Sequence, residues 1–180
     1  MKILFLGPPG AGKGTQASLV SEALGLAHVS TGDMFRALDP EGELGRRVSE
    51  IMESGELVPD DIVIEMLEAR ISEPDAAGGY ILDGFPRTIG QAEALDRFLG
   101  EGGLDRVVVL EVGEDELVTR ILARGRADDT AEAVRTRLRV YAADTEPLIA
   151  HYAPRGIVRR IDGVGAVDEI TELILGALAG

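Results

Sequence analysis

The sequence predicts an α/β fold in which a five-stranded parallel sheet carries helices on both faces. Five short apolar runs alternate with segments whose apolar residues recur at helical spacing, and strands that alternate with helices form parallel sheets. The run at 107–112 is almost entirely β-branched or aliphatic, as a strand covered on both faces requires. At 180 residues the chain fits a single domain, 1–180, with a sizeable core.

The strands and helices can be assigned in order along the chain. The predicted strands are 3–6, 26–29, 80–82, 107–112 and 157–161. The predicted helical segments are 15–24, 31–55, 62–71, 88–100, 117–122, 130–147 and 166–178. Gly25 closes the first helix, Pro40 and Gly42 interrupt the second, and Pro147 ends or bends the sixth. Asp60 or Asp61, and later Thr130, are expected as N-caps.

The stretch 7–15 reads Gly-Pro-Pro-Gly-Ala-Gly-Lys-Gly-Thr and lies between the first strand and the first helix. Its glycines let backbone N–H groups turn toward an anion, and the helix presents its positive end to the same point. Lys13 adds a mobile cation for a β- or γ-phosphate. This stretch therefore predicts a nucleotide phosphate-binding loop. A magnesium-binding hydroxyl usually follows the lysine directly, whereas here Gly14 intervenes before Thr15.

Two charged residues follow the third strand, at the sheet edge where ligands of parallel sheets bind. Asp83 directly follows Leu82, and a carboxylate there can hold magnesium, directly or through its waters. Arg87 follows in the same loop and is expected to clamp an anion. The structural alternatives are an aspartate that only starts a turn before Gly84 and an arginine that only faces solvent.

Composition narrows the class of partner. The net charge of −14 argues against nucleic acid or an anionic membrane as partner, so a small molecule is expected. The chain has no cysteine, which excludes disulfides and cysteine zinc sites. The apolar run at the N-terminus is too short for a signal sequence, and no run approaches the roughly 18 apolar residues of a membrane span. We therefore expect a soluble, cytoplasmic protein.

Five motifs in order resemble those of the adenylate kinases nearly end to end. They occupy 7–15, 30–36, 55–60, 82–88 with Gln91, and 126–130. The resemblance implies the P-loop nucleoside monophosphate kinase fold, with an AMP-binding arm at about 30–59 and a short lid at about 124–130. It also implies a monomeric phosphotransferase that uses ATP and magnesium to convert AMP reversibly, giving two ADP, in adenine nucleotide homeostasis.

The resemblance also implies roles for individual residues. ATP would be held by Gly10, Ala11, Gly12, Lys13, Gly14, Thr15, Arg124 and Gly165. AMP would be held by Thr31, Arg36, Glu56, Leu57, Val58, Gly84, Phe85, Pro86, Arg87, Gln91, Arg126 and Arg137. The catalytic cations around the transferring phosphoryl group would be Lys13, Arg87, Arg120, Arg124, Arg126 and Arg137, with magnesium near Asp83.

The chain departs from longer members of this family at the lid. They insert a segment, often zinc-bearing, where this chain passes directly from Arg124 through Gly125 to Arg126, so no structural zinc is expected. The chemistry also needs no general base, since a phosphate monoester has a second pKa of about 6 and is anionic at neutral pH. We therefore expect His28 and His151 to be ordinary surface or packing residues.

Other functions share part of this pattern. A UMP/CMP kinase has most of the same motifs, although Thr31 and Gln91 favour AMP. A non-catalytic P-loop nucleotide switch would share only the phosphate loop and would lack the second set of arginines. Individual residues also have structural alternatives: Gln91 fits a capping box with Thr88, and Arg137 fits a solvated helix face.

Overall fold

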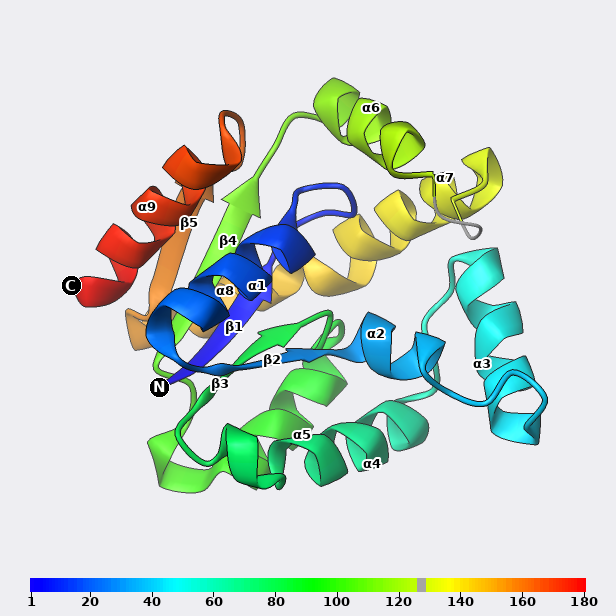
Figure 1. Ribbon diagram of the computed structural model, residues 1–180, viewed down its shortest axis with the longest axis horizontal. Coiled ribbons are helices and arrows are strands. Elements are labelled where there is room, and N and C mark those ends of the chain that lie inside the picture. Colours follow the sequence, from blue (N-terminus) through cyan, green and yellow to red (C-terminus); the bar gives the residue numbers. More distant parts are fainter. Residues whose placement is uncertain (126–128) are drawn as a thin grey trace.

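The computed structural model describes residues 1–125 and 129–180, and its centre is a parallel sheet (Figure 1). The sheet has five strands in the order β2-β3-β1-β4-β5, and every pair is parallel. The strands are β1 (Lys2–Leu6), β2 (Ala27–Ser30), β3 (Tyr80–Asp83), β4 (Arg106–Glu111) and β5 (Val158–Asp162). This confirms the predicted fold class.

Helices connect the strands and cover both faces of the sheet. The α-helices are α1 (Lys13–Leu24), α2 (Thr31–Arg36), α3 (Glu43–Ser54), α4 (Asp60–Ile71), α5 (Ile89–Leu99), α6 (Glu114–Arg124), α7 (Ala131–Val140), α8 (Pro147–Tyr152) and α9 (Val167–Ala179). Short 3₁₀ turns lie at Pro74–Ala76, Gly100–Gly102 and Ala153–Arg155. None of the described helices is long and apolar enough to cross a membrane.

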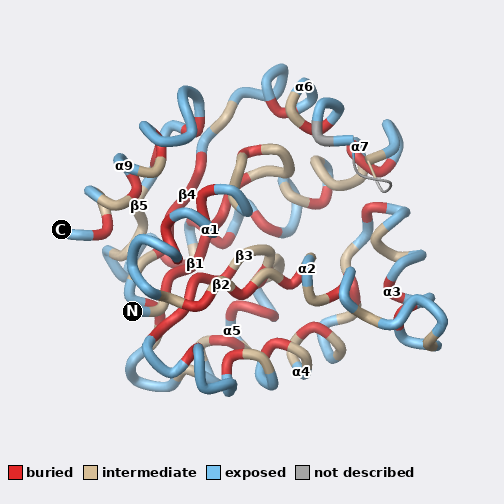
Figure 2. The backbone as a smooth tube through the Cα atoms, in the orientation of Figure 1, coloured by how far each residue is buried: buried red, intermediate tan, exposed pale blue. Residues whose placement is uncertain are grey.

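Alternate residues of the strands point to opposite faces and form two separate cores. On β1, Leu4 and Leu6 face a cluster that includes α4, α5 and α8, whereas Ile3 and Phe5 face one that includes α1 and α9. All four side chains are 2% exposed or less. Figure 2 shows β1, β3 and β4 buried along most of their length, whereas the edge strand β5 is largely intermediate or exposed, and solvent reaches the outer sides of the helices. The continuous apolar runs therefore belong to strands covered on both faces.

Local residue choices explain most of the helix ends. Gly25 takes a left-handed conformation at the end of α1, as predicted. Thr130 accepts a hydrogen bond from the N–H of Ala133 at the start of α7, which confirms that cap. The predicted segment 130–147 ends as expected: α7 runs to Val140, a π-helical turn follows at Tyr141–Thr145, and α8 begins at Pro147. The predicted cap at Asp60 is wrong, because Pro59 is the N-cap and Asp60 is the first residue of α4.

The turn between α2 and α3 packs closely on the start of α3. A Cβ atom on Gly45 would lie 2.0 Å from the carbonyl oxygen of Asp39, so only glycine fits there. The helices α2, α3 and α4 pack on one another through the first core cluster, with Phe35 and Val48 buried in it. Figure 1 places α3 far from the sheet and near α7.

Candidate functional site

The phosphate loop lies at the carboxyl end of β1, the central strand. Gly7, Gly10 and Gly12 have φ angles of 148°, 86° and 91°, which L-residues with side chains rarely adopt. Gly10 also lies against α6, where a Cβ atom would come within 2.8 Å of Ile121 Cγ1. Backbone conformation therefore favours glycine at all three positions, close packing also requires it at Gly7 and Gly10, and α1 begins directly after Gly12.

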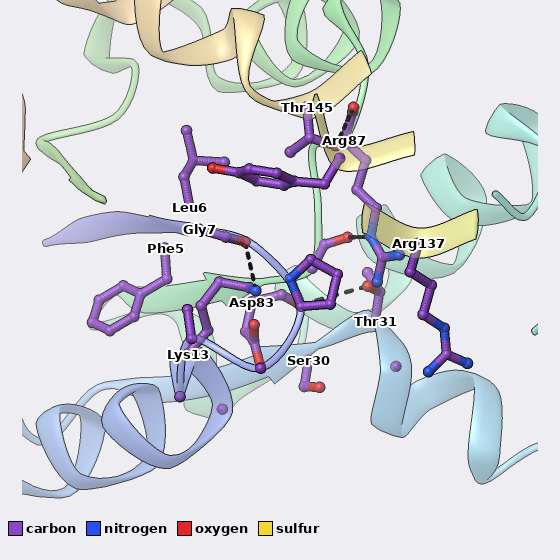
Figure 3. Close-up of a pocket in the computed structure, with 18 of the residues that line it drawn as sticks. Phe5, Leu6, Gly7, Lys13, Ser30, Thr31, Asp83, Arg87, Arg137 and Thr145 are labelled. Atoms are coloured by element: carbon purple, nitrogen blue, oxygen red, sulfur yellow. Dashed lines mark hydrogen bonds between the residues drawn. The ribbon is translucent and has the colours of Figure 1, made fainter. Parts of the chain in front are cut away.

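Lys13 bends back over this loop (Figure 3). Its Nζ donates to the carbonyl oxygens of Gly7, at 2.7 Å, and Pro8, at 3.0 Å. These bonds keep the ammonium group at the mouth of the loop. A phosphate bound to the loop N–H groups would therefore meet a cation already in position.

One continuous cleft joins the predicted donor and acceptor residues. Its volume is about 890 Å³, and it is lined from the phosphate loop, α2, the end of α3, the loop after β3, and α7. The predicted site residues that line it are Gly10, Ala11, Gly12, Lys13, Gly14, Thr15, Thr31, Arg36, Glu56, Leu57, Val58, Asp83, Gly84, Pro86, Arg87, Gln91, Arg120, Arg137 and Gly165. Residues from nearly the whole length of the chain thus meet at one place.

Phe85, Arg124 and Arg126 stand apart from the other predicted site residues. The side chain of Phe85 is 1% exposed and packs in the first core cluster. Arg126 lies outside the described residues, as does the side chain of Arg124.

Asp83 lies beside the start of α1, where the sequence departs from the usual phosphate loop. A Cβ atom on Gly14 would be 3.3 Å from Asp83 Oδ2, tighter than an ordinary contact. Glycine therefore leaves room for the carboxylate, while Thr15 is exposed in the cleft. His28 Nε2 lies 3.6 Å from the same oxygen. The histidine is thus a neighbour of the predicted metal carboxylate, which its sequence context did not indicate.

The Asp83 carboxylate remains charged at neutral pH. Burial tends to raise its pKa, but the neighbouring His28 and the charges of Lys13 and Arg87 outweigh burial and lower the pKa below its ordinary value. Among the described residues, no group of three or more His, Cys, Asp or Glu side chains could hold a metal ion. A single carboxylate near bound phosphates suits Mg²⁺, which keeps several of its waters.

The part of the cleft predicted to hold AMP, called the acceptor end, contains two buried polar side chains, Thr31 and Gln91, which are 1% and 2% exposed. Gln91 Oε1 accepts from the N–H of Arg87 at 2.7 Å, and Gln91 Nε2 donates to Asp60 Oδ1 at 2.7 Å. Thr88 Oγ1 accepts from the N–H of Gln91, so half of the capping box is present. The amide of Gln91 is therefore fixed in orientation by two neighbours, at the edge of the cleft.

Arg87 lies deep in the acceptor end. Its Nε donates to the carbonyl oxygen of Gly84 at 2.7 Å, and its own carbonyl oxygen accepts from Thr145 Oγ1 at 2.8 Å. Burial lowers the pKa of the guanidinium, Asp83 opposes this effect, and Arg137 and Arg36 lower the pKa further. Cations that repel one another in a cleft favour an anionic ligand between them.

The other described arginines of the cleft are held by protein groups. Arg36 pairs with Asp33 at 2.6 Å, and Arg120 pairs with Glu116 at 2.7 Å. Arg137 Nη1 pairs with Asp129 at 2.9 Å, and its Nη2 donates to the carbonyl oxygen of Met52 at 2.9 Å. Arg137 therefore connects α7 to the end of α3, and it is 16% exposed rather than on a solvated helix face.

Sequence reasoning missed several residues that line or support the cleft. They include His28, Met52, Tyr141, Thr145 and Gln16. Met52 acts through its backbone carbonyl and Thr145 through a bond to the backbone of Arg87. Neither contact can be recognised from the spacing of residues in the sequence. Gln16 could have been noticed as a polar residue at an inward position of α1.

A parallel α/β sheet with a phosphate loop on its central strand, opening into a cleft lined by arginines, defines a nucleotide-binding protein of the P-loop class. The family model described as "Adenylate kinase" matches residues 5–157. An adenylate kinase of Nocardia farcinica is 54% identical over 181 residues, covering 99% of each chain. One of Stenotrophomonas maltophilia is 51% identical over 187 residues, covering 100% of each. This chain belongs to the adenylate kinase family, which confirms the resemblance seen in the sequence.

Proposed function

We propose that this enzyme transfers the γ-phosphoryl group of ATP reversibly to AMP, giving two ADP. The observation that carries this function is the single cleft with a phosphate loop at one end and Arg36, Arg87 and Arg137 at the other. A nucleotide switch needs only the first end. The relatives named adenylate kinase cover the whole chain and support the same reaction.

Some residues of the cleft position the nucleotides, and others supply positive charge around the phosphoryl group. The N–H groups of 10–15 hold the ATP phosphates, and Lys13 follows the phosphoryl group from donor to acceptor. Arg87 and Arg137 neutralise the charge on the moving group, while Arg36 binds the acceptor phosphate. Arg120, Arg124 and Arg126 contribute further positive charge. Because the AMP phosphate is already an anion, its oxygen attacks without a base, and the cost is mainly that of alignment and charge.

Mg²⁺ bound with ATP would screen the phosphate oxygens, and Asp83 would hold it through its waters. Two observations support this role: the carboxylate of Asp83 is ionised, and the absence of a side chain at Gly14 leaves space beside it. No structural zinc is needed for the reaction. Chelation of magnesium should stop turnover, whereas a zinc-selective chelator should leave the melting temperature unchanged; a drop in that temperature would reveal a zinc site.

The acceptor base is proposed to lie against Thr31 and Gln91, with Glu56, Leu57, Val58 and the backbone at Gly84, Phe85 and Pro86 around the nucleotide. Gly165 is proposed to lie beside the base of ATP. The arm at about 30–59 and the lid at about 124–130 would close over the nucleotides and exclude water. We further propose that the enzyme acts as a cytoplasmic monomer.

A coupled assay with ATP and each of AMP, CMP, UMP and GMP tests the function directly. A site built for hydrogen bonds rejects analogues that leave them unpaired by up to about 10⁴-fold. AMP should exceed CMP and UMP by at least about two orders of magnitude in kcat/KM. If CMP or UMP is phosphorylated as efficiently as AMP, the enzyme is a pyrimidine nucleotide kinase. If the nucleotides bind but no phosphoryl group is transferred, the protein is a nucleotide switch.

A further inference from the structure

We propose that Gln16 is a positioning residue that fixes the wall for the donor base relative to the phosphate loop. The inference rests on the proposed function, which assigns ATP to this end of the cleft. Gln16 follows Thr15 on α1, is 3% exposed, and lines the cleft together with Gly165 and Val167. Its side chain connects the phosphate-loop helix to the beginning of α9.

Both ends of the Gln16 amide are used in this connection. Nε2 donates to the carbonyl oxygen of Val167 at 2.9 Å, and Oε1 lies 2.8 Å from Thr171 Oγ1. The single proton of this hydroxyl is shared between Gln16 Oε1 and the same Val167 carbonyl oxygen, 2.9 Å away. The neighbour of Gln16 on α1, Ala17, and Ile170 on α9 both belong to the second core cluster. A buried amide with both ends bonded holds its partners in one geometry, because an alternative packing would leave a polar group unpaired.

The loop before α9 is fixed at its other end as well. Arg120 Nη1 donates to the carbonyl oxygen of Gly163 at 2.9 Å, and the N–H of Gly163 donates to the carbonyl oxygen of Glu111 at 2.8 Å. Gly165 lies between these two attachment points with a φ of 142°. The segment 163–167 is therefore a preformed wall. The side-chain hydrogen bonds of Gln16 connect this wall to the phosphate-loop helix, in addition to the apolar packing of α1 on α9.

This geometry gives Gln16 an effect that depends on the ligand. A triphosphate held by 10–15 is joined covalently to its base, so both ends fit only if the wall stands at the right distance from the loop. This requirement does not apply to a ligand that carries phosphates and no base. Loss of the Gln16 connection should therefore weaken ATP binding and leave the binding of inorganic tripolyphosphate nearly unchanged.

The experiment compares the dissociation constants of ATP and tripolyphosphate by calorimetry for the whole protein and three variants. Gln16→Met keeps the length of the side chain but removes both of its hydrogen bonds. Thr171→Val removes the hydroxyl that bonds Gln16 Oε1, together with the contact of that hydroxyl with the carbonyl oxygen of Val167. Ser21→Ala is the matched control, because Ser21 is a buried polar residue of α1 that bonds within its own helix, to the carbonyl oxygen of Ser18.

For Gln16→Met we expect the Kd for ATP to rise about tenfold, equivalent to about 1.4 kcal/mol, with the Kd for tripolyphosphate within about twofold. Thr171→Val should change the ratio of the two constants in the same direction by less, and Ser21→Ala should not change it. In turnover assays, the KM for ATP should rise more than kcat falls.

Equal weakening of both ligands would place the effect in the phosphate loop and overturn the proposal. A lower melting temperature with an unchanged ratio would also overturn it, since it would make the role of Gln16 purely structural. Failure of the proposed function would be seen in the unmodified enzyme, as an inability to bind ATP or to phosphorylate AMP. The positioning role is judged only from the ratio between variant and unmodified protein.

Discussion

The two ends of the cleft, proposed to hold the donor and the acceptor, are built in different ways. The donor end consists of backbone N–H groups from one continuous stretch, 7–15, fixed by positive-φ glycines and by the strand beneath them. The acceptor end consists of side chains from α2, α5 and α7 and from the loop after β3, each oriented by a neighbour. A local backbone site tolerates few changes, whereas an assembled site can be altered one contact at a time.

Lys13→Met should have the largest effect, because Lys13 is the one side chain of the donor loop that carries a charge. We expect kcat to fall about a thousandfold, or about 4 kcal/mol of barrier, while the circular dichroism spectrum stays that of the folded protein. Lys2→Met, at the opposite end of β1, is the matched control and should leave kcat unchanged. Retention of more than about a tenth of kcat would rule out this role of Lys13.

Arg137→Ala should have the next largest effect and tests whether one acceptor-side arginine acts on the moving group. We expect kcat to fall about a hundredfold, with a smaller rise in the KM for either nucleotide, because charge develops on the phosphoryl group only during transfer. Arg135→Ala is the control, because Arg135 is an exposed arginine on the same helix, α7. An effect of Arg137→Ala on KM alone would restrict Arg137 to binding.

The double variant Thr31→Ala/Gln91→Asn should narrow the preference for AMP over CMP about tenfold, mainly through lost AMP activity. Both side chains are buried at the cleft, and the shorter amide cannot keep its bonds to Arg87 and Asp60 together. Asp60→Ala should reduce the preference in the same direction, because it frees the Gln91 amide to rotate. An unchanged preference in both variants would move base recognition to other residues.

Asp96→Asn should have the smallest effect and leave the KM for AMP unchanged, although Asp96 lies on the same helix as Gln91. Asp96 pairs with Arg155, and its Oδ2 lies 3.3 Å from His151 Nε2. These contacts attach α5 to α8 and to the turn that follows it. We expect a loss of about 1 kcal/mol, or about 2–4 °C in melting temperature. A double-mutant cycle with Arg155→Met measures the pair itself.

The pH dependence of stability gives a second test of this pair. Burial raises the pKa of Asp96, but Arg155 and His151 outweigh burial and lower the pKa below its ordinary 3.8. The stabilisation by Asp96 is therefore present above the unfolded-state pKa and is lost as pH falls through the lower folded-state value. Asp96→Asn should flatten the acid side of the stability curve, and a change confined to alkaline pH would contradict the assignment.

The same difference between the two ends explains what the sequence could predict. The phosphate loop is local, so its residues, conformation and place between strand and helix follow from one short stretch. The position of Asp83 beside it follows from the general rule for parallel sheets. The contacts of His28 with Asp83, of Arg137 with Met52 and of Thr145 with Arg87 join residues far apart in the chain. Such contacts depend on helix packing, which residue spacing does not encode.

The strand order also affects how the chain can fold during synthesis. β1 pairs with β3 and β4, through Lys2 with Tyr80 and Ile3 with Arg106, and not with β2, the next strand in sequence. Its apolar residues therefore have no sheet partner until the ribosome has passed residue 83, and no second partner until it has passed residue 111. In that interval β1 is an unpaired, apolar strand of the kind that aggregates or binds chaperones. The strand that precedes the phosphate loop is thus synthesised early but acquires its two neighbouring strands late.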